Sequence, residues 1–473
     1  MEIDSFLGSI FNLYQFPFLS VLFSAVLGSW IYLNIISLKS HFAVPAFRTA
    51  VSNSLTRKRR RHYLTNRLLN TSITSNATLT IEHFSNELPF LSIIVPARNE
   101  EQNIENCIRS LLTQNYPNFE VIAVDDNSTD KTLEILMNIK EKISHSEPSA
   151  EQSLPSSASL LTSSTSSTSN TRLHVISLKD KPQGWKGKTW AMQQGYLQSK
   201  GDILLFTDAD TTYISSDAIL SSLTYMQRER LDALTSISFS ELRDFISKTV
   251  MPLWDIFSVI FGRDPSKMND PRSKVAYLLG AFIMIKKEVL EDIGTFDSVR
   301  DAIQEDKVLG EHLKYGGFKV RIIKAYDLIS ALWSRDAYTL WYGIERTLAP
   351  IIKDNALKVL WNLSILFFMA LLPFLSLPYT IWLNAISREQ LILFGGASLS
   401  YSLFLFCLNS SCCIVTVVAV AAKDIARYKI TPLYSAFAAL SSFFLIIAYL
   451  NALLKFGLNH QKSIPWRGRK TQA

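Results

Sequence analysis

Residues 91–126 read LSIIVPARNEEQNIENCIRSLLTQNYPNFEVIAVDD, and our fold prediction starts from this stretch. Leu91–Val95 is apolar apart from one serine and stops at Pro96, which is typical of a buried parallel strand. Asn103–Gln114 has apolar residues at helical spacing, and Glu120–Val124 is a second strand-like run. A strand, a helix and a strand in this order predict an α/β fold with a mostly parallel sheet.

The same alternation continues along the chain. Thr132–Ile139 has the pattern of a second helix, and Leu173–Leu178 and Ile203–Phe206 read as further strands. We therefore expect residues 88–330 to form one domain, with ligands bound at the carboxyl ends of its strands. Residues 144–171 are mostly Ser, Thr, Pro and Ala, so we predict a disordered insertion there.

Acidic residues follow two of the predicted strands. Asp208 and Asp210 come directly after one strand, and two carboxylates at this spacing can face a divalent cation such as Mg²⁺ or Mn²⁺. Asp125 and Asp126 end another strand and should face the same crevice. The alternative is that both pairs belong to turns or cap the following helices.

A third acidic pair, Glu305 and Asp306, precedes the helical run Val308–Lys314. Acidic residues are favoured at a helix start because of the helix dipole. A carboxylate here is also suited to act as a general base for an acceptor hydroxyl. The residues by themselves leave both interpretations open.

Long apolar runs lie at both ends of the chain, which is only 19% charged. Phe16–Leu38 is long enough to cross a bilayer, so we predict that residues 1–40 hold a retained anchor. Residues 357–456 should hold about three more spans. The candidates are Val359–Trp382, Leu391–Ala421 and Thr431–Leu453.

The basic residues predict the orientation. Arg57–Arg61, in the basic linker 41–87, indicates a cytosolic catalytic domain held against an anionic membrane surface. Three simple C-terminal crossings would put the basic tail 457–473 outside. We expect a cytosolic tail, which requires that one segment is re-entrant, that an interfacial helix is hidden, or that Leu391–Ala421 is not one helix. Pro373 and Pro378 make the first span the best candidate for a break.

Two other classes of protein fit the composition poorly. The formal net charge is +7, but the basic residues lie beside apolar runs, so we expect no nucleic-acid partner. Four cysteines in a chain of 473 residues do not make a disulfide framework.

Taken together, the motifs resemble glycosyltransferase family 2. Ser92–Glu101 followed by Val124–Asp130 is similar to the start of that family, and the resemblance continues through Thr207–Asp210, Gly280–Phe282 and Glu305-Asp306. It implies a Rossmann-like GT-A domain that binds a nucleotide sugar, here with one N-terminal and about three C-terminal transmembrane helices. A narrower resemblance, through Gly184–Ala191 and Trp466–Arg469, is to membrane enzymes near the hopanoid- and carotenoid-associated glycosyltransferases.

The resemblance also implies roles for individual residues. Asp306 would be the catalytic base of an inverting transfer, and Asp210, with Asp208, would hold Mg²⁺ or Mn²⁺. Asp125 would either contact the nucleoside or brace its loop, and Lys188 would either lie near the phosphates or be a surface lysine. The residues expected to bind substrates are Pro96, Ala97, Arg98, Glu100, Asp126, Lys188, Asp208, Gly280 and Glu305.

The departures from the family pattern narrow the function. Trp341–Thr347 lacks the Gln-x-x-Arg-Trp signature of processive synthases, which argues against a polymer-extruding enzyme. The narrower resemblance implies transfer to a lipid such as a carotenoid, hopanoid or glycerolipid. The resemblance favours UDP over GDP in the donor. Residues 331–356 suit an interfacial helix that presents the acceptor. A processive polysaccharide synthase and a catalytically inactive membrane scaffold remain alternatives.

Overall fold

The computed structural model describes residues 2–46, 88–146, 172–394, 397–458, 463–466 and 469–472. The basic run Arg57–Arg61 and residues 147–171 of the predicted insertion lie outside the described residues. The chain forms two compact units. One comprises Pro45–Phe239 and Ala276–Ala331, and the other Met1–Val44, Ser240–Val275 and Leu332–Ala473.

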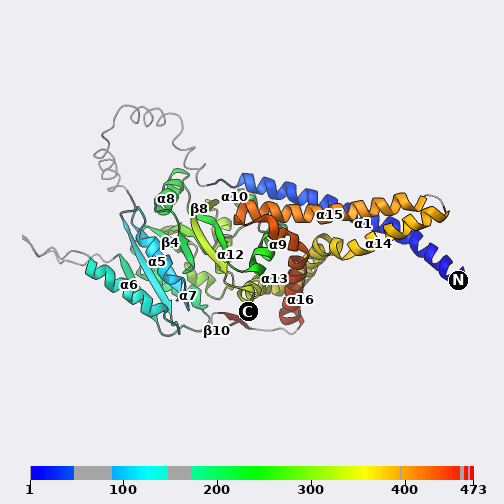
Figure 1. The fold of residues 1–473 in the computed structure, drawn as a ribbon. Coiled ribbons are helices and arrows are strands. Elements are labelled where there is room, and N and C mark those ends of the chain that lie inside the picture. The colour runs from blue at the N-terminus through cyan, green and yellow to red at the C-terminus, as the bar shows by residue number, and fades with distance from the viewer. Residues whose placement is uncertain are drawn as a thin grey trace, which may run out of the picture. The chain divides into compact units, whose positions relative to one another are not determined.

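The first unit is built on a mixed sheet. Its strands are β1 (Leu91–Ala97), β2 (Phe119–Asp126), β3 (Leu173–Leu178), β4 (Ile203–Phe206), β5 (Thr211–Tyr213), β6 (Ala233–Leu242), β7 (Ile283–Lys286) and β8 (Val320–Ser334). They lie in the order β3-β2-β1-β4-β7-β6-β8-β5. Figure 1 labels β4 and β8 among them. The strands predicted from the sequence, β1 to β4, are mutually parallel, whereas β7 pairs antiparallel with both β4 and β6.

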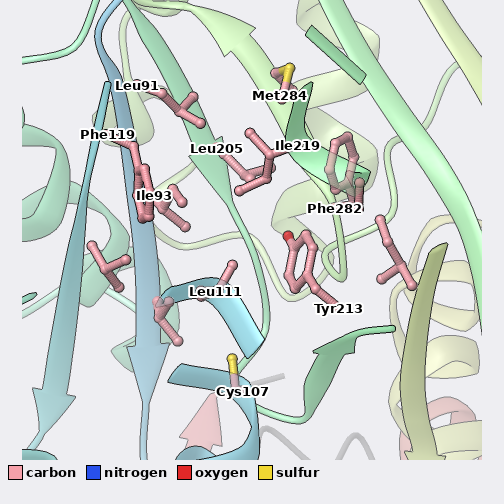
Figure 2. Close-up of a cluster of buried hydrophobic side chains, with 14 of the residues drawn as sticks. Leu91, Ile93, Cys107, Leu111, Phe119, Leu205, Tyr213, Ile219, Phe282 and Met284 are labelled. Atoms are coloured by element: carbon pink, nitrogen blue, oxygen red, sulfur yellow. The ribbon is translucent and has the colours of Figure 1, made fainter. Parts of the chain in front are cut away.

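Helices cover both faces of this sheet. They are α5 (Ile104–Leu112), α6 (Thr132–Ser146), α7 (Gly187–Gln198), α8 (Ala218–Arg228), α11 (Lys287–Asp292) and α12 (Glu305–Tyr315), with the 3₁₀ turn η1 (Phe296–Val299). Leu91 and Ile93 pack with Leu111 of α5 and Ile219 of α8 in one buried cluster (Figure 2). On the opposite face α7 approaches Ile94 closely, since a Cβ at Gly195 would clash with that side chain.

The parallel register brings three strand ends to one edge. Ala97 lies opposite Asp125, and Ile94 lies opposite Phe206. The main-chain N–H of Thr207 then donates to the carbonyl of Ile94 at 3.1 Å. The loops that follow β1, β2 and β4 therefore start side by side.

The second unit is mainly helical. Its elements are α1 (Glu2–Ala43), α9 (Phe245–Ile260), α10 (Pro265–Asn269), α13 (Ala337–Leu366), η2 (Phe367–Leu371), α14 (Leu372–Phe394), α15 (Ala397–Lys423), η3 (Asp424–Tyr428), η4 (Pro432–Phe437), α16 (Ala438–Ala452) and η5 (Leu453–Leu458), followed by the hairpin β9 (Ser463–Trp466) and β10 (Arg469–Gln472). Among the described residues, four helical stretches are long and apolar enough to cross a membrane. These are Phe18–Ser40, Ala337–Ile386, Ser402–Tyr428 and Pro432–Leu458. The expected one N-terminal and three C-terminal apolar helices are thus confirmed.

The structure differs from the predictions at several boundaries. Ser240–Val275, expected inside the domain 88–330, belongs to the second, mainly helical unit. Strand β8 continues to Ser334, so the helix expected over 331–356 begins only at Ala337. Helix α13 has a kink at the non-helical residue Asn355 and then continues into the first predicted C-terminal span. That span was expected to break at its prolines. The helix instead passes Pro373 by way of the π turn η2.

Side chains from two other helices donate to main-chain carbonyls of this π turn. Pro373 has no N–H to offer the carbonyl of Met369, four residues earlier. That carbonyl accepts from the indole N–H of Trp30 at 2.9 Å, and the carbonyl of Ala370 accepts from Ser442 Oγ at 3.0 Å. Neighbouring helices can satisfy backbone groups in this way inside a bilayer, which allows a proline within a span.

Candidate active site

The loops after β1 and β2 are tied together through Arg98. The Nη1 atom of its guanidinium donates to the main-chain carbonyl of Asp126 and, at 2.8 Å, to that of Asn127. Both Asn99 and Asn127 have a φ of 52°, a left-handed conformation that asparagine tolerates better than most residues. In the structure Arg98 braces the two loops, and its predicted contact with a nucleoside stays a prediction.

Glu100 has a similar bracing role. Its main-chain N–H donates to Thr132 Oγ1 at 2.7 Å, at the start of α6, and its carboxylate accepts from Asn103 Nδ2 at 3.0 Å. Pro96 and Ala97, the other residues predicted to contact the nucleoside, are buried and are the last two residues of β1. The predicted nucleoside residues therefore lie together at the ends of β1 and β2.

The two oxygens of the Asp125 carboxylate have different surroundings. Oδ2 accepts from the main-chain N–H of Ser128 at 3.3 Å, so Asp125 does brace its own loop. Oδ1 is buried and has no hydrogen-bond partner among the described residues. The neighbouring Asp126 is also buried, at 3% exposure.

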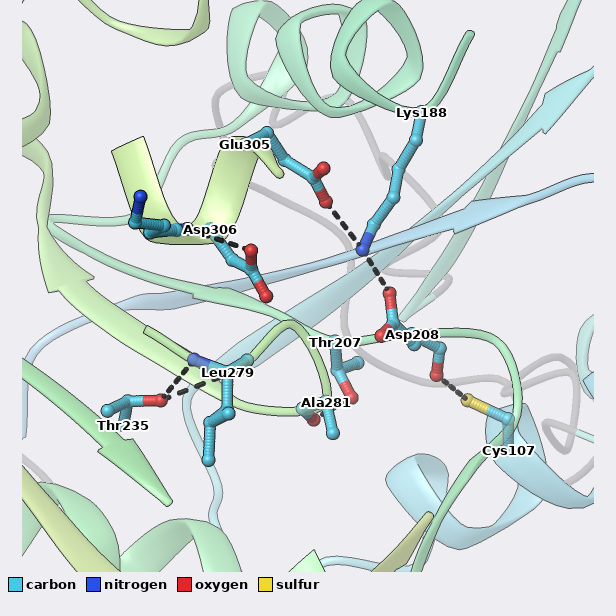
Figure 3. A network of polar contacts seen from close by, with 10 residues as sticks. Cys107, Lys188, Thr207, Asp208, Thr235, Leu279, Ala281, Glu305 and Asp306 are labelled. Carbon is cyan, nitrogen blue, oxygen red and sulfur yellow. Dashed lines mark hydrogen bonds and ion pairs between the residues drawn. The ribbon is translucent and has the colours of Figure 1, made fainter. Parts of the chain in front are cut away.

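Lys188, near the start of α7, connects carboxylates that are far apart in the sequence. Its Nζ lies 2.7 Å from Asp208 Oδ1 and 2.7 Å from Glu305 Oε1 (Figure 3). Burial alone would lower the pKa of Lys188, but the carboxylates of Asp208, Glu305 and Asp306 raise it above its ordinary value. The ammonium therefore stays charged, and Lys188 is not an ordinary surface lysine.

Gly280 lies directly against this ion pair. A Cβ at this position would lie 2.9 Å from Lys188 Nζ and 2.9 Å from Asp208 Oδ2. The backbone at Gly280 thus closely approaches the Lys188–Asp208 pair, and the substrate contact predicted for Gly280 stays a prediction. A side chain larger than hydrogen would displace one of the two charged groups.

Two threonines hold the loop that carries Gly280. Thr207 Oγ1 donates to the carbonyl of Ala281 at 2.8 Å, and Thr235 Oγ accepts from the N–H of Leu279 at 3.0 Å (Figure 3). The sequence analysis assigned no role to either threonine, although Thr207 lies within the motif it singled out. Phe282, at the end of this loop, is fully buried in the core.

Glu305 and Asp306 form the first turn of α12. The carbonyl of Asp306 accepts from the N–H of Leu278 at 3.1 Å, and its carboxylate accepts from the N–H of Lys307 at 2.8 Å. The predicted helix start is present. The carboxylate of Asp306 lies on the side of α12 that faces the Lys188–Asp208 pair (Figure 3).

The chemistry of Asp208 and Asp210 fits a divalent cation that is shared with a substrate. Burial first, and then the charges of Asp210 and Asp208, raise the pKa of the buried Cys107 thiol. The thiol donates to the main-chain carbonyl of Asp208 at 3.7 Å. Within the described residues there is no group of three metal-ligating side chains. Ions such as Mg²⁺ commonly take one or two protein carboxylates and complete their shell with phosphates and water.

Two family models match the chain around these residues. Residues 92–148 match "Glycosyl transferase family 2", and residues 163–341 match "Glycosyltransferase like family 2". The first range covers nearly all of β1 and all of β2, and the second contains Lys188, Asp208, Glu305 and Asp306.

The chain is also similar to individual proteins, at low sequence identity. The chain is 24% identical to the probable glycosyltransferase YdaM of Bacillus subtilis over 305 residues, which are 61% of this chain and 64% of that protein. It is 32% identical to a beta-monoglucosyldiacylglycerol synthase of Nostoc over 149 residues (31% of this chain, 25% of that protein) and 23% identical to a 4,4'-diaponeurosporenoate glycosyltransferase of Staphylococcus aureus over 254 residues (54% and 57%). The chain thus spans between a quarter and just under two thirds of these relatives.

Among solved structures, the mannosyltransferase PcManGT from Pyrobaculum calidifontis, in complex with GDP-Man and Mn²⁺, is similar with a TM-score of 0.45. It is 15% identical, and the match covers 92% of this chain and 99% of that one. The mixed sheet and the family matches agree on the fold. The chain therefore carries a glycosyltransferase family 2 domain with the GT-A fold.

Proposed function

We propose that this protein transfers a sugar from a nucleotide sugar, preferably a UDP-sugar, to a hydroxyl group of a membrane lipid. The observation that carries this proposal is the grouping of Lys188, Asp208, Glu305 and Asp306 in a family 2 domain. The described part of the chain also has four helices that are apolar enough to cross a membrane. Together these features support a donor site and a lipid environment in one protein.

The names of two relatives support a lipid acceptor. One is a beta-monoglucosyldiacylglycerol synthase and the other a 4,4'-diaponeurosporenoate glycosyltransferase. The first name denotes a glycerolipid and the second a carotenoid, both of which partition into membranes. We infer an acceptor of this kind for the present chain, and we place its catalytic domain on the cytosolic side because of the basic run Arg57–Arg61.

In the proposed reaction Asp306 accepts the proton of the acceptor hydroxyl. The oxygen then attacks the anomeric carbon while the bond to the diphosphate oxygen breaks, and the nucleoside diphosphate leaves. One such displacement inverts the anomeric centre, whereas retaining glycosidases need a second carboxylate as nucleophile. Asp306 lies in the first turn of α12, where the helix dipole favours a negative charge.

Asp210 and Asp208 would hold a Mg²⁺ or Mn²⁺ ion, which when bound would neutralise charge on the donor diphosphate. Arg98 and Glu100 would keep the nucleoside loops in shape through their contacts to Asn127 and Thr132. The Gly280 loop would form part of the wall against which the acceptor lies.

Membranes that contain the wild type or Asp306→Asn test this proposal. Each is incubated with UDP- and GDP-sugars, Mg²⁺ or Mn²⁺ and a total lipid extract, and the lipids are analysed by mass spectrometry. We expect a mass gain of a single sugar, lowered at least about 100-fold in Asp306→Asn because a general base contributes about 10²–10⁴ in rate. The exposed Asp301→Asn is the matched control and should keep wild-type activity.

A long sugar polymer in place of a glycolipid would favour a processive synthase. No product from any donor would favour an inactive scaffold. Equal activity in wild type and Asp306→Asn would remove Asp306 from the mechanism.

A further inference from the structure

The Lys188 ammonium is shared by two elements of the site. Asp208 follows β4, and Glu305 belongs to the first turn of α12, yet both carboxylates lie 2.7 Å from the same nitrogen. The side chain of Lys188 is 20% exposed, and that of Glu305 is 11% exposed. Charge-assisted hydrogen bonds in such partly buried places are stronger than ion pairs on the open surface.

The helix that carries Lys188 is firmly attached to the sheet. Gly195 of α7 lies so close to the sheet that a Cβ there would clash with Ile94 at 2.4 Å and crowd Val124 at 3.3 Å. Just before α7, the N–H of Lys186 donates to the carbonyl of Arg300 at 2.7 Å. Lys188 therefore extends from a fixed support.

Besides the Glu305–Lys188 contact, α12 has backbone contacts with residues 277 and 278. Leu278 donates to the carbonyl of Asp306, and a Cβ at Gly310 would lie 2.7 Å from the backbone of Tyr277. Contacts to the 277–278 segment set the position of the helix, and the Glu305–Lys188 contact directs its first turn towards Asp208. Asp306 follows Glu305 directly, so its placement depends on both.

We propose that Lys188 is a positioning residue that ties the first turn of α12 to Asp208 and thereby holds Asp306 at the donor. This inference rests on the proposed function. Lys188 acts here through Glu305, which distinguishes the role from a direct contact with the donor phosphates. A tether affects the turnover number, whereas a phosphate contact affects donor binding.

The first test is a double-mutant cycle with Lys188→Gln, Glu305→Gln and the combined variant. We expect each single variant to lower kcat about 100-fold, the size of effect reported for small misplacements of reacting groups, with little change in the donor KM. The combined variant should lose no more than the worse single one, because both changes break the same contact. Lys188→Arg should recover part of kcat, and the exposed Lys142→Gln should match the wild type.

A second variant disturbs the same contact without removing a charge. In Gly280→Ala the new Cβ displaces the Lys188 and Asp208 side-chain ends, which are flexible, so the fold should tolerate it. We expect a loss of kcat similar to that of Lys188→Gln. Wild-type kcat in Gly280→Ala, additive losses in the cycle, or a raised donor KM with normal kcat would overturn the proposal.

Hydrogen exchange separates this inference from the proposed function. In donor-free full-length protein, the amides of residues 305–309 should exchange faster in Lys188→Gln than in Lys142→Gln. If the wild type glycosylates lipids but this exchange is unchanged, the tether is wrong and the function stands. If exchange rises but no variant or wild type transfers sugar, the tether exists and the proposed function fails.

Discussion

At the scale of single residues, Arg98 shows how a buried charge can serve loop structure. The residue is 8% exposed, and its guanidinium donates to the carbonyls of Asp126 and Asn127. Hydrogen bonds from a charged donor contribute about 1.5–3 kcal/mol, so Arg98→Met should lower the free energy of unfolding by about 2 kcal/mol. The loosened loop should also raise the donor KM, and both are measured on detergent-solubilised protein by denaturation and by donor titration.

Arg109→Met is the matched control for this change. Arg109 also carries a guanidinium in the same unit, but it is 52% exposed and pairs only locally with Glu105 at 2.8 Å on α5. Exposed pairs of this kind contribute less than about 1 kcal/mol, so its loss should leave the donor KM unchanged. Equal effects of the two substitutions would contradict a bracing role for Arg98.

At the scale of the elements, the N-terminal helix is part of the helical unit and more than an anchor. Trp30 of α1 is fully buried, packs edge-on against Phe257 of α9 at 5.8 Å and donates to the Met369 carbonyl. Trp30→Phe keeps most of the ring but removes the donor at a place where Pro373 supplies no N–H. We expect Trp30→Phe to lower the free energy of unfolding by about 1 kcal/mol. Hydrogen bonds between membrane helices contribute somewhat less than this on average, whereas a buried carbonyl left without a hydrogen bond costs somewhat more.

The measurement is the thermal midpoint in detergent, compared with Tyr32→Phe. Tyr32 lies on the same helix but is 65% exposed, so removal of its polar group should leave the midpoint unchanged. If both variants melt like the wild type, the Trp30–Met369 hydrogen bond does not stabilise the proline-containing span.

At the scale of the whole molecule, the open question is on which side of the membrane the C-terminal tail lies. Ala337–Ile386 is one helical stretch of 50 residues, far more than the roughly 20 that cross a bilayer, so a part of it lies outside the spanning segment. We expect the catalytic domain and the tail both on the cytosolic side, as their basic residues favour. Reporter fusions at residue 473, and proteolysis of the catalytic domain in inside-out vesicles, measure this.

Detergent-opened vesicles are the control, since both parts must then be accessible. A reporter that is active only on the outer side, together with a cytosolic catalytic domain, would mean three simple C-terminal crossings. It would then exclude a re-entrant segment among them.

The amino-acid sequence was sufficient for features that depend on local patterns. The apolar runs of β1 to β4, the helical spacing of α5 and the long apolar helices each appear within one continuous stretch, because hydrophobic periodicity reflects the burial of that stretch. The acidic residues at strand ends could be placed at one edge because parallel strands end together. These signals predicted the fold and the neighbourhood of the candidate site.

The partners of individual side chains followed only from the tertiary structure. Nothing near Lys188 in the sequence indicates that it pairs with Glu305, and nothing near Arg98 indicates that it turns to main-chain carbonyls. The antiparallel β7 beside β4 and the helical passage through Pro373 likewise depend on distant segments. Such contacts are set by strand order and by the donors that other helices supply, whereas a local pattern reports only which faces are buried.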